Sequence, residues 1–173
     1  MEGVINPLIQ ALLAAPDAAR AMKALWAGEG PAAAFGVPEA GKAHLAAAAC
    51  APASRAVLLV TATETAALQY VQDLRALGVP AAALLPRDMP LTHICAVDPE
   101  RSSARTKALL HLLTGEGVVV AAIAAVMERL APRELFLQGR IELRVGDETD
   151  PRALLQRLIA AGYERVPLAE HPG

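Results

Sequence analysis

The sequence has few aromatic residues: one Trp, two Tyr and two Phe make up 3% of its 173 residues. It also lacks an excess of positive charge, since its formal net charge is -2. Proteins that bind nucleic acid on their own usually neutralise phosphates with a basic face, and they often hold single strands on aromatic side chains. Both shortages argue against a stand-alone nucleic-acid-binding protein.

Two further shortages concern disulfides and membranes. The only cysteines are Cys50 and Cys95, too few for the disulfide framework of a small secreted domain, so we expect two reduced thiols. No apolar run approaches the roughly 18 residues that a membrane span needs. No basic leader precedes the first apolar stretch, which argues against a secretory signal. We therefore expect a cytoplasmic protein without membrane contact.

Hydrophobic residues are plentiful at 54%, and a core can form from them. After two expected helices at 5–13 and 17–26, apolar runs of strand length alternate with helical patterns. The expected strands are 32–36, 56–61, 81–85 and 118–123. Each run is apolar throughout, which is typical of a parallel sheet with helices on both faces. The sequence therefore predicts an α/β domain over residues 1–131.

Local signals refine two of the intervening helices. Thr61 and Glu64 have the spacing of a capping box, and Asp98 with Pro99 is a typical helix start. In the helix that begins there, apolar residues are expected to face inward and basic residues outward. The inward set is Ala104, Ala108, Leu109, Leu112 and Leu113, and the outward set is Arg101, Arg105 and Lys107.

Residues 132–173 have a different pattern, which predicts the start of a small α+β second domain. Residues 140–145 alternate apolar with charged side chains, as in a half-exposed strand. Asp150 and Pro151 begin a helix, and a short strand is expected at 163–166. The buried stripe of that helix is expected to be Leu154, Leu155, Leu158 and Ile159.

Residues 36–42 match the phosphate-binding loop G-x-x-x-x-G-K, placed between a predicted strand and a helix. In such a loop the glycine backbone wraps the phosphates, the lysine reaches them and the next hydroxyl binds Mg²⁺. Here Ala43 replaces the hydroxyl, and Glu39 adds a negative charge. None of the predicted strands ends in the acidic residue that an ATPase needs.

We therefore expect Gly36, Gly41 and Lys42 to form a degenerate loop that is empty, with no cofactor and no catalytic residue. No metal site is predicted either, because His93 and Cys95 are the only local ligand pair and two such ligands do not make a tetrahedral site. The alternative interpretation is a small P-loop nucleotide-binding enzyme, an ATPase or kinase, that uses the same three residues.

The order of these motifs is similar to that of a known family. The matching parts are the loop at 36–42, the strand at 57–61 and the segments 85–90, 98–105, 118–127, 145–148, 154–158, 161–166 and 170–173. Together they resemble the N-terminal UvrB-like module of the bacterial transcription-repair coupling factors (Mfd). The likeness covers nearly the whole chain. It implies a degenerate helicase-like α/β domain that has lost ATP binding, followed over residues 132–173 by the start of a small domain that docks UvrA.

The resemblance implies a non-catalytic module that recruits the nucleotide excision repair protein UvrA to stalled transcription complexes. The parent protein would be an ATP-dependent DNA translocase whose other domains contact RNA polymerase and DNA. A domain that only restrains that motor is a further possibility. For the UvrA contact we expect Arg152, Arg157 and Arg165, because they are predicted to face outward and guanidinium groups bind carboxylates in a bidentate manner.

Overall fold

A computed structural model describes residues 6–28, 30, 31, 33–51, 56–87 and 99–166. The chain divides into two compact units, Met1–Glu128 (unit 1) and Arg129–Gly173 (unit 2). Some features expected from the sequence lie outside the described residues, namely the Asp98 cap, the His93 and Cys95 pair, and residues 88–90 and 170–173.

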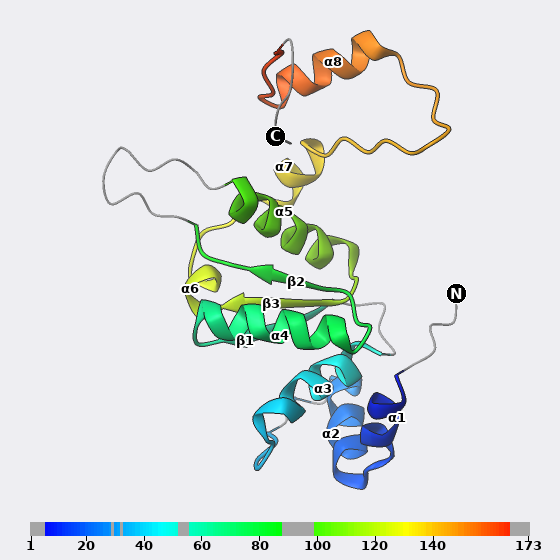
Figure 1. Cartoon of the computed structure of the whole chain (residues 1–173), viewed down its shortest axis with the longest axis vertical. Helices are drawn as coiled ribbons and strands as arrows, with labels where there is room; N and C mark the ends of the chain where they lie inside the picture. The colour runs from blue at the N-terminus through cyan, green and yellow to red at the C-terminus, as the bar shows by residue number, and fades with distance from the viewer. Residues whose placement is uncertain (1–5, 29, 32, 52–55, 88–98, 167–173) are drawn as a thin grey trace. The chain divides into compact units, whose positions relative to one another are not determined.

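Unit 1 is built on a parallel sheet of three strands, β1 (Val57–Thr61), β2 (Ala81–Leu84) and β3 (Val118–Ala122), in the order β1-β3-β2 (Figure 1). Both outer strands pair with β3, so that Val57 and Ala81 lie opposite Val118. β3 is apolar throughout because both of its faces are covered, and none of its residues is more than 1% exposed. The predicted parallel strands at these three positions are confirmed.

Helices cover the two faces of this sheet. α4 (Glu64–Ala76) contributes Leu74 to a core that also contains Val118 and Val120. α5 (Pro99–Thr114) contributes Ala108 to a second core with Val119 of the same strand. Successive strand side chains point to opposite faces, so adjacent valines enter different cores. The α/β class is confirmed, with helices on both faces of β2 and β3, whereas Leu58 and Val60 on one face of β1 are 46% and 45% exposed.

Three helices precede the sheet: α1 (Pro7–Ala14), α2 (Pro16–Ala27) and α3 (Glu39–Cys50). The Asn6 side chain accepts a hydrogen bond from the Leu8 N–H at 2.9 Å and so caps α1. Gly28 ends α2 at φ 67°, a left-handed conformation that glycine adopts without strain. The two helices predicted from the sequence are confirmed, with boundaries shifted by one or two residues.

Two local predictions in unit 1 were wrong. Residues 33–36 form no strand and are exposed, Phe35 by 92%; the alanines bury little surface, and Gly36 turns the chain at φ 71°. The cap of α4 is Thr63, whose hydroxyl accepts from the Ala66 N–H at 3.2 Å. Thr61 instead ends β1, and its hydroxyl donates to the Thr63 carbonyl at 3.0 Å.

The prediction that Arg105 faces outward was also wrong, since this residue is only 7% exposed. Arg101, Arg105 and Ala108 lie at helical spacing, so Arg105 belongs to the same side of α5 as the buried alanine. Its guanidinium finds polar partners there, because Nη1 donates to the Leu85 carbonyl at 2.6 Å. Its charge is paired with Glu128, whose Oε2 lies 2.9 Å from Nη2, and an arginine is tolerated inside a protein when it is paired.

After β3 the chain forms the single turn α6 (Ile123–Val126), and unit 2 then contains α7 (Arg133–Gln138) and α8 (Pro151–Ala160). Asp150 caps α8 by accepting from the Arg152 N–H at 3.0 Å, as its sequence predicts. The strands predicted at 140–145 and 163–166 are wrong: both segments lie within the described part of unit 2, and neither pairs with a strand there.

The buried stripe predicted for α8 is likewise wrong. Leu154 and Leu158 are half-buried, whereas Leu155 and Ile159 are 37% and 54% exposed. In fact, none of residues 129–166 is buried. The stripe lacks an opposing apolar surface in the described residues, so its pattern does not produce burial.

Across the described parts of both units, no helix has the length and apolar character to cross a membrane.

Candidate functional site

The residues of the predicted phosphate loop lie at the start of α3. This helix begins at Glu39, which places Gly41 and Lys42 in its first turn. The Gly41 N–H donates to the Pro38 carbonyl at 2.8 Å, so it is already used within the turn. A side chain at position 41 would meet Val37 and Pro38 at 3.3 Å, which gives the glycine a packing role.

The lysine of this loop is bound to a neighbouring carboxylate. Lys42 Nζ lies 2.6 Å from Glu39 Oε2, and the Tyr70 hydroxyl donates to the other carboxylate oxygen. The hydrogen bond from Lys42, followed by that from Tyr70, lowers the pKa of Glu39. Burial, followed by the hydrogen bond to Glu39, raises the pKa of Tyr70 to about 12. The ammonium group that would reach a phosphate is therefore paired with Glu39.

The residue after the lysine lacks a hydroxyl, and none of the three strands ends in a carboxylate that could hold magnesium. Ala43 is 1% exposed and belongs to the core of unit 1. The strands end at Thr61, Leu84 and Ala122. No group of three or more His, Cys, Asp or Glu residues suited to a metal occurs in the parts of the chain that the structure describes.

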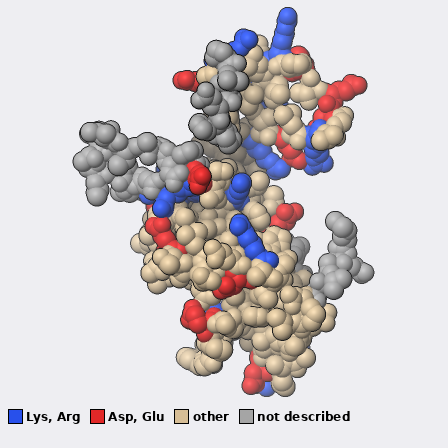
Figure 2. Space-filling view, in the orientation of Figure 1, with Lys and Arg blue, Asp and Glu red and all other residues tan. Residues whose placement is uncertain are grey.

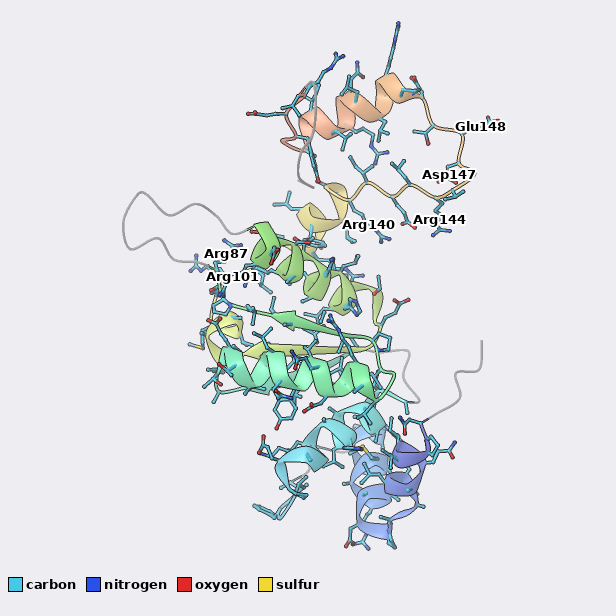
Figure 3. The ribbon with its side chains drawn as sticks, in the orientation of Figure 1. Arg87, Arg101, Arg140, Arg144, Asp147 and Glu148 are labelled. Carbon is cyan, nitrogen blue, oxygen red and sulfur yellow. The ribbon has the colours of Figure 1, made fainter. Side chains whose placement is uncertain are left out.

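A charged cluster that the sequence reasoning missed lies where β2 ends and α5 begins. Arg101 Nη1 donates to Glu64 Oε2 at 3.0 Å, and Arg105 Nη2 lies 2.9 Å from Glu128 Oε2. Figure 3 shows Arg87 and Arg101 near each other at this end of the sheet. The signal in the sequence was the spacing of Arg101 and Arg105, which repeats along the apolar side of α5. Glu64 and Glu128 are thus each paired with an arginine.

The arginines of unit 2 fall into two groups. Arg140 and Arg144, which Figure 3 labels, lie on the segment that precedes α8. Both bind Glu142, at 2.6 and 2.7 Å, and the Arg144 hydrogen bond is the main cause of the lowered pKa of Glu142. The predicted docking residues differ: Arg152, Arg157 and Arg165 are exposed, and their guanidinium groups have no ion pair or hydrogen bond with any described residue. Figure 2 shows basic side chains that project from unit 2 into solvent.

The three arginines predicted to dock UvrA are spread along α8 and the segment after it. Arg152 and Arg157 lie on α8, five positions apart, and Arg165 follows the turn at Gly162. Five positions on a helix place two side chains on different sides, about 140° apart. The apolar residues of α8 lie between them on one side of the helix, so the arginines flank a partly exposed apolar stripe. Such an arrangement is typical of the polar rim of a protein interface.

Comparison with known proteins gives a consistent set of relatives. A transcription-repair-coupling factor of Bacillus subtilis is 28% identical over 123 residues, which are 69% of this chain and 10% of that protein. The corresponding factor of Staphylococcus epidermidis is 29% identical over 111 residues, 64% of this chain and 9% of that protein. The chain thus spans about a tenth of the length of the curated relatives it matches. No protein-family model matches it.

Proposed function

Because the chain is related to the transcription-repair coupling factors, we propose that it is a non-catalytic interaction module that recruits UvrA to stalled transcription complexes in the cytoplasm. In the longer parent protein, ATP-dependent DNA translocation and the contacts with RNA polymerase and DNA belong to other domains. The relatives support involvement in transcription-coupled repair. The assignment of UvrA to this chain is the part of the proposal that needs a direct test.

The observation that carries the docking proposal is the state of the arginines in unit 2. Arg152, Arg157 and Arg165 are exposed and have no charged partner in the described part of the chain, whereas Arg140 and Arg144 share Glu142. An unpaired guanidinium can bind an acidic group without first breaking an ion pair. Arginine is also enriched at interfaces. These three residues are therefore the proposed contacts with acidic groups on UvrA.

The arrangement at α3 supports the non-catalytic part of the proposal. Lys42 is bound to Glu39, and Ala43 supplies no hydroxyl for magnesium. A nucleotide would have to displace a carboxylate that belongs to the same turn. We expect isothermal titration with Mg-ATP to show no binding in the submicromolar range, which corresponds to about 8 kcal/mol. Submicromolar binding would instead favour the P-loop enzyme.

The docking proposal is tested by capture of purified UvrA on the immobilised chain. Arg152→Glu, Arg157→Glu and Arg165→Glu are each compared with the parent chain, and circular dichroism shows whether each variant folds. The matched control is Arg20→Glu on α2, because Arg20 is exposed and lies in unit 1. Reversal of a charge buried at an interface costs about 2 to 5 kcal/mol, which is at least about thirtyfold in affinity.

The outcomes separate the function from the residues. If the parent chain does not capture UvrA, the docking function is wrong. If it captures UvrA and the three variants bind as well as the control, the function stands and the choice of arginines is wrong. Loss of binding in one or more of the three variants, with Arg20→Glu unaffected, supports both.

A further inference from the structure

Charged side chains hold the main chain of the three residues that follow β2. The contacts are Arg105 Nη1 to the Leu85 carbonyl at 2.6 Å, Arg101 Nη1 to the Pro86 carbonyl at 3.3 Å, and the Arg87 N–H to Glu128 Oε1 at 2.8 Å. These side chains come from α5 and from the segment after α6. The path of the chain out of the sheet is therefore set by side chains that lie far away in the sequence.

Arg105 and Glu128 form a pair that is largely excluded from water. Their side chains are 9% and 23% exposed, and Arg105 Nη2 lies 2.9 Å from Glu128 Oε2. Neither of these two atoms has a hydrogen bond of suitable geometry, so their contact is an ion pair rather than a directed hydrogen bond. Charge attraction at short range is strengthened by the low polarity around a buried pair.

This ion pair accounts for the position of the Glu128 carboxylate. Glu128 is the last residue of unit 1, and it follows only the single turn of α6. The guanidinium of Arg87 lies 4.0 Å away and is 62% exposed, so it holds the carboxylate weakly. The buried charge of Arg105 is the stronger attraction, because a carboxylate that moved away would leave this cation without a counter-charge.

We propose that Arg105 is a positioning residue that acts through Glu128 on the main chain at Arg87, so that the exit of β2 and the end of unit 1 are fixed together. Arg105 touches the Leu85 carbonyl directly, but its effect on the Arg87 N–H passes through the carboxylate. This chain of contacts from Arg105 through Glu128 to the Arg87 N–H is independent of the UvrA proposal. It concerns the charged cluster of unit 1, and it makes the amide of Arg87 the reporter of a side chain 18 positions away in the sequence.

The test is amide hydrogen exchange of the whole chain, read at Arg87 by NMR. Glu128→Ala removes the acceptor, and Arg105→Met removes the cation while keeping an apolar stem of similar length. Lys107→Met is the matched control, because it makes the same change at an exposed position of the same helix. We expect exchange at Arg87 to accelerate at least about tenfold in Glu128→Ala and in Arg105→Met, and to stay unchanged in the control.

Two further variants test whether Arg105 acts through Glu128 and through its positive charge. In the double variant Arg105→Met with Glu128→Ala, exchange at Arg87 should be no faster than in Glu128→Ala alone, because both changes break the same contact. Arg105→Lys keeps the charge and should keep the amide protected. If Arg105→Met does not fold, Arg105→Gln takes its place. The proposal would be overturned if the Arg87 amide stays protected in folded Arg105→Met or Arg105→Gln. It would also be overturned if Arg105→Lys accelerates exchange at Arg87 as much as Glu128→Ala does.

Discussion

The two units of the chain contain similar apolar patterns but differ in what those patterns bury. In unit 1 the residues of β3 are at most 1% exposed, because helices cover both faces of this strand. In unit 2 the helix α8 forms where the sequence predicts it, yet no described residue of the unit is buried. Periodicity thus predicts the element, whereas burial also needs an opposing apolar surface.

The largest expected difference between the units is in core substitutions. Leu74→Ala in unit 1 removes a side chain that is 0% exposed, and we expect a loss of about 3 kcal/mol in the free energy of unfolding. Leu155→Ala on α8 is the matched control at 37% exposure, with an expected loss under about 1 kcal/mol. Denaturant unfolding measures both. Equal losses would contradict the difference in burial.

Glycine substitutions give the next largest difference. Gly117→Ala places a side chain 2.2 Å from the Pro80 carbonyl oxygen, at φ 67°. The backbone must shift as well as accept a strained conformation, and we expect a loss of about 2 kcal/mol or more. Gly162→Ala, at φ 95° with nothing within 4 Å, is expected to cost about 1 kcal/mol. Thermal unfolding of the two variants shows which loses more stability. A larger loss in Gly162→Ala than in Gly117→Ala would contradict this prediction.

A smaller effect concerns pH and the contact between Tyr70 and Glu39. The pKa of Tyr70 is raised to about 12 by burial and by Glu39, against about 10 for an unfolded chain. Folding therefore favours the neutral phenol, and this stabilisation is complete below about pH 10 and is lost as the pH rises towards 12.

We expect the ultraviolet signal of tyrosinate to show a step near pH 12 that Tyr70→Phe removes and Tyr163→Phe keeps. Tyr163 is a suitable control because it lies in unit 2 and is 56% exposed. A titration in which Tyr70→Phe leaves that step in place would show that Tyr70 is not protected as described.

The smallest expected effect lies in the ion pairs of unit 2. Glu142→Gln removes the carboxylate that Arg140 and Arg144 share, at an exposed site where the Glu142 side chain is 44% exposed. Exposed ion pairs are screened by water and salt, so we expect no measurable shift in the melting temperature of the chain. A clear decrease would mean that these pairs organise unit 2 more than their exposure indicates.

The sequence predicts the sheet of unit 1 well because its signals are local and agree with one another. Continuous apolar runs mark β1, β2 and β3, and glycine and proline residues separate them from the helices. The α/β class follows from that alternation. The expected strand at 32–36 failed for a physical reason: an alanine-rich run can be apolar without burying enough surface to join a sheet.

The sites were predicted less well because they depend on contacts between distant residues. Arginine is usually a surface residue, so the sequence predicts that Arg105 is exposed. Its burial depends on contacts with the Leu85 carbonyl and Glu128. The contact between Glu39 and Lys42 has the i,i+3 spacing of a helical ion pair and could have been found from the sequence. The contact between Glu39 and Tyr70 needs the packing of α3 beside α4 and cannot be derived from spacing along the chain.

The most direct test of the difference between the units is hydrogen exchange of the whole chain, with β3 compared with α8. Amides of a buried central strand exchange only when the unit unfolds, whereas those of an exposed helix exchange through local opening. We expect protection in β3 to exceed that in α8 by at least about two orders of magnitude. Equal protection of the two elements would contradict the account, because it would mean that α8 belongs to a core as stable as that of the sheet.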